Sequence, residues 1–157
     1  MDGEVRLIDV DITIQVGNEP DTFGETKEGA FSLRLAESLR TDGKWGSPGK
    51  VINSNGDAND VAWGKNATWI DYHGQVDGEH VGVAILNHPR SFRHPTRWHV
   101  RSHGLFAANS FGNRSFDPAG EGGSHVLRKG ESLTLRNRMV LHKGGEKVEQ
   151  IAEQYEK

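Results

Sequence analysis

Apolar and polar residues alternate near the start of the chain, in a pattern typical of a β-strand. Every second residue from Ile8 to Val16 is aliphatic, and acidic or polar residues lie between them. Because successive side chains of a strand point to opposite faces, we expect a half-buried strand over Val5–Val16. A second strand is expected over Phe31–Ala36, with Phe31, Leu33 and Leu35 on one side.

The clearest local signal predicts a hairpin within Trp69–His88. The dipeptide Asp77-Gly78 favours a two-residue type I′ turn, and such a turn determines the register of both strands. The expected pairs are Val76–Glu79, Tyr72–Val83 and Ile70–Ile85 on an apolar face, and Asp71–Ala84 and Trp69–Leu86 on a second face that carries His73 and His88.

Further elements complete the expected framework. Arg97–His103 alternates and predicts a strand, the apolar run Leu105–Ala108 continues the core, and Ser132–His142 predicts the last strand. In that strand we expect Leu133, Leu135, Met139 and Leu141 inward, with Arg136, Arg138, Val140 and His142 opposite. Helical spacing of apolar residues predicts a short helix over Glu146–Lys157. Loops are expected at Thr41–Gly64 (with a short strand at Val51–Ile52), Pro89–Thr96 and Gly112–Gly130.

These elements predict an all-β fold. The chain has 157 residues, a length that suits one domain, and its 20 glycines suit a fold with many turns. We therefore expect residues 1–157 to form a single antiparallel β-sandwich domain with a short C-terminal helix.

Charge and hydropathy narrow the classes of function. A net charge of −3 gives no field that would attract nucleic acid. No apolar stretch approaches the roughly 20 residues of a membrane span, and the N-terminus lacks the apolar segment of a signal peptide. A soluble protein of unknown compartment is expected. The absence of cysteine excludes disulfides and thiolate chemistry.

Candidate chemistry concentrates in the stretch Asn87–Gly112. Burying polar and cationic side chains without partners costs several kcal/mol each, so these residues are expected to face solvent or line a pocket. The stretch contains His88, His94, His99 and His103, together with Arg90, Arg93, Arg97 and Arg101.

The predicted strand Arg97–His103 would place His99, Arg101 and His103 in a row on one face. Imidazole exchanges protons near neutral pH and guanidinium donates to oxygen atoms, so the row suits an oxygen-rich ligand such as a sugar or sugar acid. A solvent-exposed polar face explains the same row equally well. Glu28 is a candidate general base, and an ordinary turn pair of Lys27 and Glu28 is the alternative.

A metal site is the other interpretation of the histidines. His88, His94, His99 and His103 would supply three imidazoles, with Asp71 or Glu28 as an oxygen ligand. Their spacing matches no strong zinc pattern, and the cation Arg101 between two of them opposes a divalent metal. An organic ligand is therefore favoured, and no cofactor is expected.

A series of short motifs resembles those of one family. They are Phe23–Gly29, Trp63–Lys65, Trp69–Tyr72, Asn87–Pro89, Arg93–Thr96, Trp98–Arg101, Gly104–Asn109 and Phe111–Gly112. From about Asp21 to its C-terminus the chain resembles the bacterial family catalogued as "methane oxygenase PmoA". The family usually has Asp, Tyr and Pro where this chain has Asn87, His103 and Ser110, and the second difference weakens any role for His103.

The resemblance implies a galactose mutarotase-like β-sandwich connected with carbohydrate use. Members of the family are usually longer, so a naturally short sandwich and one that contains only the family's C-terminal part are both open here. An incomplete sandwich would favour an oligomer. Methane oxidation is not expected, because the membrane subunit of that name has several apolar spans. Carried over by motif, the site residues are Lys27, Glu28, Arg34, His88, His99, Arg101, Asn109 and His142.

Three functions stay open, and catalysis is among the open questions. The first is a carbohydrate-active protein in which Glu28 and His99 exchange protons and the other six residues bind the ligand. The second is a non-catalytic carbohydrate-binding or structural module. The third is a histidine-ligated metal enzyme. The expected partner is a small molecule, with carbohydrate favoured, and neither nucleic acid nor membrane.

Overall fold

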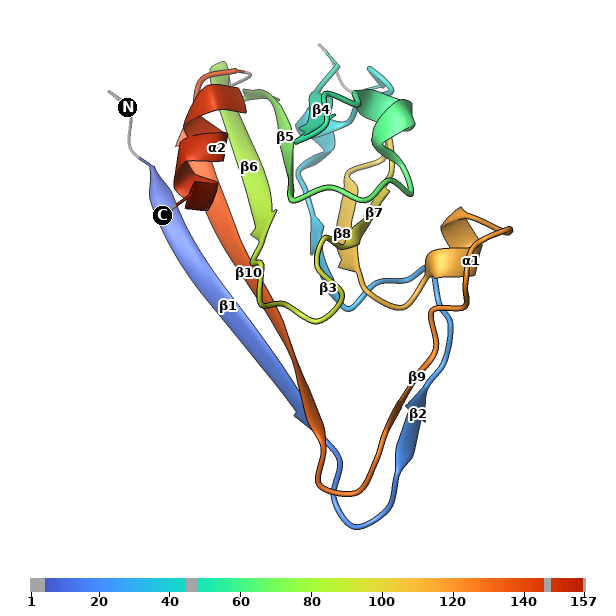
Figure 1. Ribbon diagram of the computed structural model, residues 1–157. Helices are drawn as coiled ribbons and strands as arrows, with labels where there is room; N and C mark the ends of the chain where they lie inside the picture. Colours follow the sequence, from blue (N-terminus) through green and yellow to red (C-terminus); the bar gives the residue numbers. More distant parts are fainter. Residues whose placement is uncertain (1–4, 45–47, 146–147, 157) are drawn as a thin grey trace.

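The computed structural model describes residues 5–44, 48–145 and 148–156. Its strands are antiparallel, and two sheets pack face to face (Figure 1). The larger sheet contains, in spatial order, β1 (Arg6–Gln15), β10 (Ser132–Lys143), β6 (Glu79–Asn87), β5 (Trp69–Val76) and β4 (Lys50–Asn53). The smaller sheet contains β3 (Phe31–Arg34), β8 (Leu105–Asn109) and β7 (Arg97–Val100). The all-β fold expected from the sequence is confirmed.

The apolar faces of the two sheets form the main core. Ile70, Tyr72 and Ile85 of the larger sheet share one cluster with Trp98 and Phe106 of the smaller sheet, and all five are 0% exposed. Burial of each such side chain contributes about 1.5–3 kcal/mol. The indole Nε1 of Trp98 donates to the Ala67 carbonyl at 2.9 Å, so the polar atom of this buried ring is satisfied.

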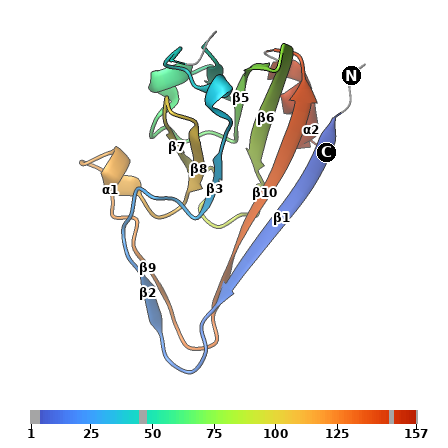
Figure 2. The ribbon, with the colours of Figure 1, turned by 180° about the vertical axis from the view of Figure 1, so that it is seen from behind.

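A second pair of strands extends the molecule at one end. β2 (Asp21–Phe23) pairs with β9 (His125–Leu127), and these strands diverge from β1 and β10 in the shape of a V (Figures 1 and 2). A separate apolar cluster that includes Phe111, Leu127 and Leu133 joins the two arms. The ring centroids of Phe23 and Phe111 are 5.6 Å apart in this cluster.

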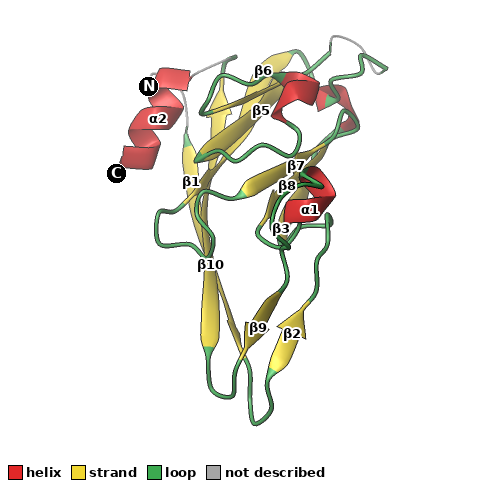
Figure 3. Ribbon diagram, turned by 45° about the vertical axis from the view of Figure 1, so that its right-hand side comes forward, coloured by secondary structure: helices red, strands yellow, loops and turns green. Residues whose placement is uncertain are grey.

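The helix α2 (Val148–Glu156) covers the outer face of the larger sheet (Figure 3). Ile151 and Tyr155 pack there against an apolar cluster that includes Trp69, Leu86 and Val140. The C-terminal helix is therefore confirmed over the described residues, whereas positions 146, 147 and 157 of the predicted helix lie outside them. No helix in the described part of the chain is long and apolar enough to cross a membrane.

The predicted hairpin is confirmed in every pair. Val76 faces Glu79, and the register continues to Trp69 opposite Leu86. Asp77 and Gly78 have φ angles of 50° and 82°, as a type I′ turn requires.

The strand expected over Arg97–His103 is wrong beyond Val100. β7 ends at Val100, and residues 101–104 form a turn in which the Gly104 amide donates to the Arg101 carbonyl at 3.0 Å. Leu105–Asn109 then returns as β8, antiparallel to β7, so His99, Arg101 and His103 do not form a row along one strand. Gly104 has a φ of 81°, which glycine adopts without strain.

The burial expected for the last strand is wrong at one position. Leu133 and Leu135 are buried as expected, but Leu141 is 36% exposed. Leu141 pairs with Val83 of β6 on one side and with Arg6 of β1 on the other. Exposure of the side chains rises across these three strands, from the half-buried Val83 to the exposed Leu141 and Arg6. The smaller sheet therefore covers only the part of the larger sheet nearer β4.

The expected loops contain short elements. Lys50–Asn53 of the first loop forms β4, which includes the expected Val51–Ile52, and Asn59–Ala62 forms a 3₁₀ turn; residues 45–47 lie outside the described part. Another 3₁₀ turn covers Glu37–Leu39. The loop after Gly112 contains the one-turn helix α1 (Asn113–Phe116) as well as β9.

Candidate functional site

His99 occupies the outer face of the smaller sheet, away from the main core. It lies on β7 opposite Ala107 of β8, and Ala107 lies opposite Ser32 of β3. The neighbouring residues Trp98 and Val100 point inward and belong to the main core. Although His99 is on the outer face, it is only 4% exposed, so other segments must cover its imidazole ring.

An aromatic wall covers one side of His99. The Gly64 amide donates to the Trp98 carbonyl at 2.8 Å, and this bond holds Gly64 and the preceding Trp63 along β7. The ring centroid of Trp63 lies 6.5 Å from that of His99, and the ring of Phe116 in α1 lies 5.7 Å away. The sequence did not indicate either aromatic residue as part of the site. For Phe116 it offers no signal, since this residue lies in a segment expected to be a loop.

The segment Thr26–Ala30 covers the other side of His99. The Ala30 amide donates to the Ala108 carbonyl at 3.3 Å, and the Thr26 amide donates to the Phe111 carbonyl at 3.2 Å. Gly29, with a φ of 22°, passes so close to β8 that a Cβ there would lie 3.1 Å from the Cβ of Ala107. This close approach places Lys27 and Glu28, the two residues before Gly29, beside His99.

Burial of His99 favours a neutral imidazole. Burial lowers the pKa of His99, and the cations Arg101 and Lys27 lower it further, whereas the Glu28 carboxylate and a hydrogen bond with the Lys27 backbone oppose this effect. Burial therefore lowers the pKa of His99 by more than the Glu28 carboxylate raises it. The structure thus brings together four of the expected site residues: Lys27, Glu28, His99 and Arg101.

Two polar atoms of this site lack partners. The Nδ1 atom of His99 and the Nε1 atom of Trp63 are both buried, and neither has a hydrogen-bond partner within the described residues. Buried polar groups in folded proteins nearly always have partners, so two unpaired polar atoms on rings whose centroids are 6.5 Å apart are unusual. Such atoms are typical of a site that completes its hydrogen bonds with a ligand or water.

The lowered pKa of His99 has a consequence for stability. Between about pH 6.5 and the lower value of the folded state, the unfolded chain binds more protons than the folded one, so acidification destabilises the fold. His94 adds to this effect, because burial lowers its pKa as well. We expect the free energy of unfolding to fall from about pH 6.5 to pH 5, with a slope of at most about 1.4 kcal/mol per pH unit for each histidine.

Urea unfolding at a series of pH values measures this slope. His99→Gln should make the slope shallower, because the side chain with the lowered pKa is then absent. A slope for His99→Gln equal to that of the unaltered protein would contradict a neutral, buried His99.

Asn109 has a structural role, contrary to the expectation that it binds ligand. It is 1% exposed, its Nδ2 donates to the Thr26 carbonyl at 2.9 Å, and its Oδ1 accepts from the Phe111 amide at 2.8 Å. The Nδ2 bond therefore holds the start of the segment Thr26–Ala30, and the Oδ1 bond fixes the backbone that follows β8. Arg34, at the end of β3, donates from Nη1 to the His103 carbonyl at 3.3 Å.

His88 lies on the larger sheet and not with His99. It lines a cavity of about 520 Å³ under α2, and its Nδ1 accepts from the Arg90 amide at 3.0 Å. The Nε2 atom of a neutral His88 therefore carries the proton. The other residues that line this cavity are Asp9, Asp11, Leu86, Pro89, Arg136, Asn137, Arg138, Gln154 and Tyr155.

His142 also lies on the larger sheet, in a buried acid–histidine pair. Its Nε2 lies 2.9 Å from Oδ1 of Asp71, and the two side chains are 1% and 0% exposed. The imidazole lies against Gly82, where any Cβ would overlap the ring. The pair lies on the larger sheet, whereas His99 lies on the smaller one, so His142 is not part of the His99 site.

The alternative of a metal site built from the four histidines finds no support in the geometry of the described residues. His99 and His103 belong to the smaller sheet and its turn, whereas His88 lies on the larger sheet. His94 is instead bonded at Nδ1 to Oδ1 of Asn87 and at Nε2 to the hydroxyl of Tyr155, at 2.9 and 3.2 Å. Within the ranges that the structure describes, no three His, Asp or Glu side chains converge as metal ligands.

Comparison with known proteins places the chain in a family. The family model described as "Family of unknown function (DUF6807)" matches residues 1–156. The chain belongs to DUF6807. No curated protein and no solved structure matches the chain. The DUF6807 match spans the whole described structure, and it assigns no activity to the His99 site.

Proposed function

We propose that this DUF6807 protein binds a carbohydrate or sugar derivative over the His99 site and acts on it by proton transfer involving His99 and Glu28. The observation that carries this proposal is the buried His99 with an unpaired Nδ1, beside an acid and against an aromatic wall. Sugars combine hydroxyl groups with an apolar face of the ring. An aromatic surface flanked by charged hydrogen-bonding groups suits both.

The charges suggest how the protons move. A neutral His99 is ready to accept a proton from the substrate, and the nearby Glu28 carboxylate then stabilises the imidazolium that forms. Arg101 and Lys27 supply cationic donors to substrate oxygen atoms. Fold analogy would make the histidine the acid and the glutamate the base, whereas the lowered pKa of His99 favours His99 as the base of the first transfer.

Access to His99 requires a local movement. The ring is covered by the segment Thr26–Ala30, whereas the side chains of Lys27 and Glu28 are themselves exposed. A ligand would therefore meet Lys27 and Glu28 first and reach the imidazole after this segment shifts.

Ligand-observed NMR with a panel of neutral sugars and sugar acids tests the proposal. Binding should be lost or at least tenfold weaker in His99→Asn, with Arg128→Gln as a control that alters an exposed residue far from β7. Full binding by His99→Asn would sink the assignment of the site.

A non-catalytic binding module is the second candidate, and the cavity of about 520 Å³ at His88 favours it. Its size lies within the roughly 300–1,000 Å³ of small-molecule sites. Cross-strand pairs of Asp9 with Arg138 and Asp11 with Arg136 supply adjacent donors and acceptors there. In the same NMR experiment, binding that survives His99→Asn but disappears in His88→Asn would select this candidate.

A further inference from the structure

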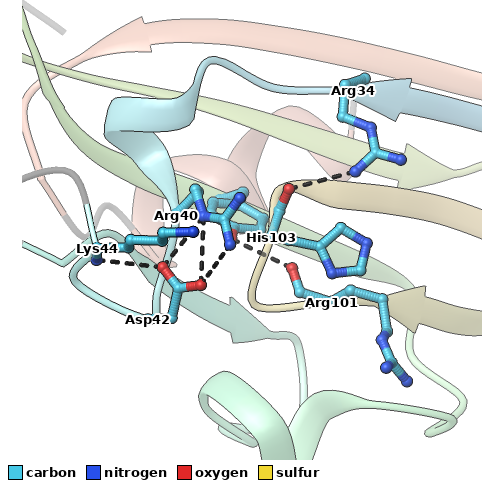
Figure 4. A network of polar contacts seen from close by, with 7 residues as sticks. Arg34, Arg40, Asp42, Lys44, Arg101 and His103 are labelled. Atoms are coloured by element: carbon cyan, nitrogen blue, oxygen red, sulfur yellow. Dashed lines mark hydrogen bonds and ion pairs between the residues drawn. The ribbon is translucent and has the colours of Figure 1, made fainter.

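Cationic side chains gather at one end of the smaller sheet. Figure 4 shows Arg34 from β3 together with Arg101 and His103 from the turn that follows β7. In this view the side chains of Arg34, His103 and Arg101 project to the same side, whereas Arg40 and Asp42 face each other on the opposite side. The family resemblance left His103 without a role, and the turn gives it two cationic neighbours.

Backbone hydrogen bonds hold this turn in place. The Leu35 amide donates to the Gly104 carbonyl at 3.0 Å, which joins the turn to the end of β3. The Thr41 amide donates to the Ser102 carbonyl at 3.0 Å, and the Tyr72 hydroxyl donates to the Arg101 carbonyl at 3.4 Å. Arg34 adds the bond from its Nη1 to the His103 carbonyl. The cations are thus arranged on a fixed backbone, a property that favours specific recognition.

The positive charge of this cluster is not compensated. Arg40 forms an ion pair with Asp42 at 2.5 Å, and that pairing lowers the pKa of Asp42 to about 2. In contrast, no carboxylate of the described residues forms an ion pair with Arg34 or Arg101.

His103 responds to this excess of charge. Burial lowers its pKa, and Arg34, Arg101 and Arg40 lower it further, with Asp42 as the opposing charge. The surroundings therefore disfavour one more positive charge and would favour a negative one.

We propose that Arg34, Arg101 and His103 bind the acidic group of the ligand of the His99 site, so that the substrate class is an acidic sugar derivative carrying a carboxylate or a phosphate. This inference rests on the proposed function for the sugar part of the ligand. Arg101 connects the His99 site with this cationic cluster, since its positive charge lowers the pKa of both His99 and His103. Guanidinium groups suit either acid, because their planar N–H donors match two oxygen atoms at once.

Inorganic sulfate tests the anion site without any sugar. The pKa of His103, measured by NMR titration of the full chain, should be higher in sodium sulfate than in sodium chloride at equal ionic strength, because a bound anion offsets the two arginines. This increase should disappear in Arg34→Gln and Arg101→Gln and persist in the Arg128→Gln control. An equal pKa in both salts, or an increase that survives both arginine variants, would overturn the inference.

Three matched sugars test the substrate class. Glucuronate or glucose 6-phosphate should bind about tenfold or more tightly than glucose, as expected for charge-assisted hydrogen bonds, and Arg34→Gln should remove this preference. The two acids distinguish a carboxylate from a phosphate.

The outcomes separate the two proposals. Equal binding of glucose and both acids would overturn the acidic substrate class and leave the proposed function standing. A sulfate effect on His103 combined with no sugar binding would support the anion site and count against the proposed function.

Discussion

Replacing His142 with leucine should lower the free energy of unfolding by about 3–5 kcal/mol. The pair formed by Asp71 and His142 is almost completely enclosed, with side chains 0% and 1% exposed. Leucine removes the group that satisfies Oδ1 of Asp71, and Oδ2 already lacks a partner among the described residues. A buried carboxyl group would then have no hydrogen bond, which is the most costly outcome for a polar group inside a protein. Urea unfolding of both proteins at neutral pH measures the difference.

A double-mutant cycle provides the control for this result. If the cost comes from the unpaired acid, adding Asp71→Ala to His142→Leu should restore part of the lost stability, because the stranded carboxyl group is then absent. A further loss of stability in the double variant would show instead that packing around Gly82, and not the pair, determines the cost.

Glu28→Gln should lower kcat by about 100- to 10,000-fold on the sugar derivative that the protein turns over, with KM changed little. The amide keeps the size of the side chain but loses the negative charge that stabilises a protonated His99. Since Glu28 is exposed, its replacement should not alter the unfolding midpoint in urea. Steady-state kinetics together with urea unfolding measures both quantities.

A neighbouring substitution serves as the matched control for this variant. Lys27→Gln alters the other exposed charge next to His99, and it should act mainly on KM because Lys27 is expected to hold substrate oxygen atoms. If kcat of Glu28→Gln stays within about twofold of the unaltered value, Glu28 takes no part in proton transfer and the catalytic proposal fails.

Local signals predicted the hairpin of β5 and β6 correctly because one short turn determines every pair in it. Asp77 and Gly78 adopt the required positive φ angles, and no distant contact is needed to set the register. The strand expected over Arg97–His103 is wrong because no local signal marks the turn that ends it. Its polar alternation continues past Val100, but the backbone reverses direction there, in a turn that includes Gly104.

The candidate site was predicted only in part. Lys27 and Glu28 do lie beside His99, but periodicity could not show this, because the contact depends on Gly29 approaching β8 from far along the chain. The expectation that His88 joins His99 failed because residues close in sequence can enter different sheets. Pro89–Thr96 carries the chain from β6 of the larger sheet to β7 of the smaller one. The galactose mutarotase-like fold stays a prediction.

The pairing of β1 with β10 has a consequence for the order of folding. These strands join the two ends of the described chain: Thr13 bonds Thr134 across 121 positions, and Asp9 bonds Arg138 across 129. Contacts between such distant positions are slow to form, since a long loop must close before they stabilise anything. During synthesis on the ribosome, β1 would leave the exit tunnel and wait without its partner until β10 emerges. Its aliphatic face would stay open to chaperones or to other chains while the residues between the two strands are made.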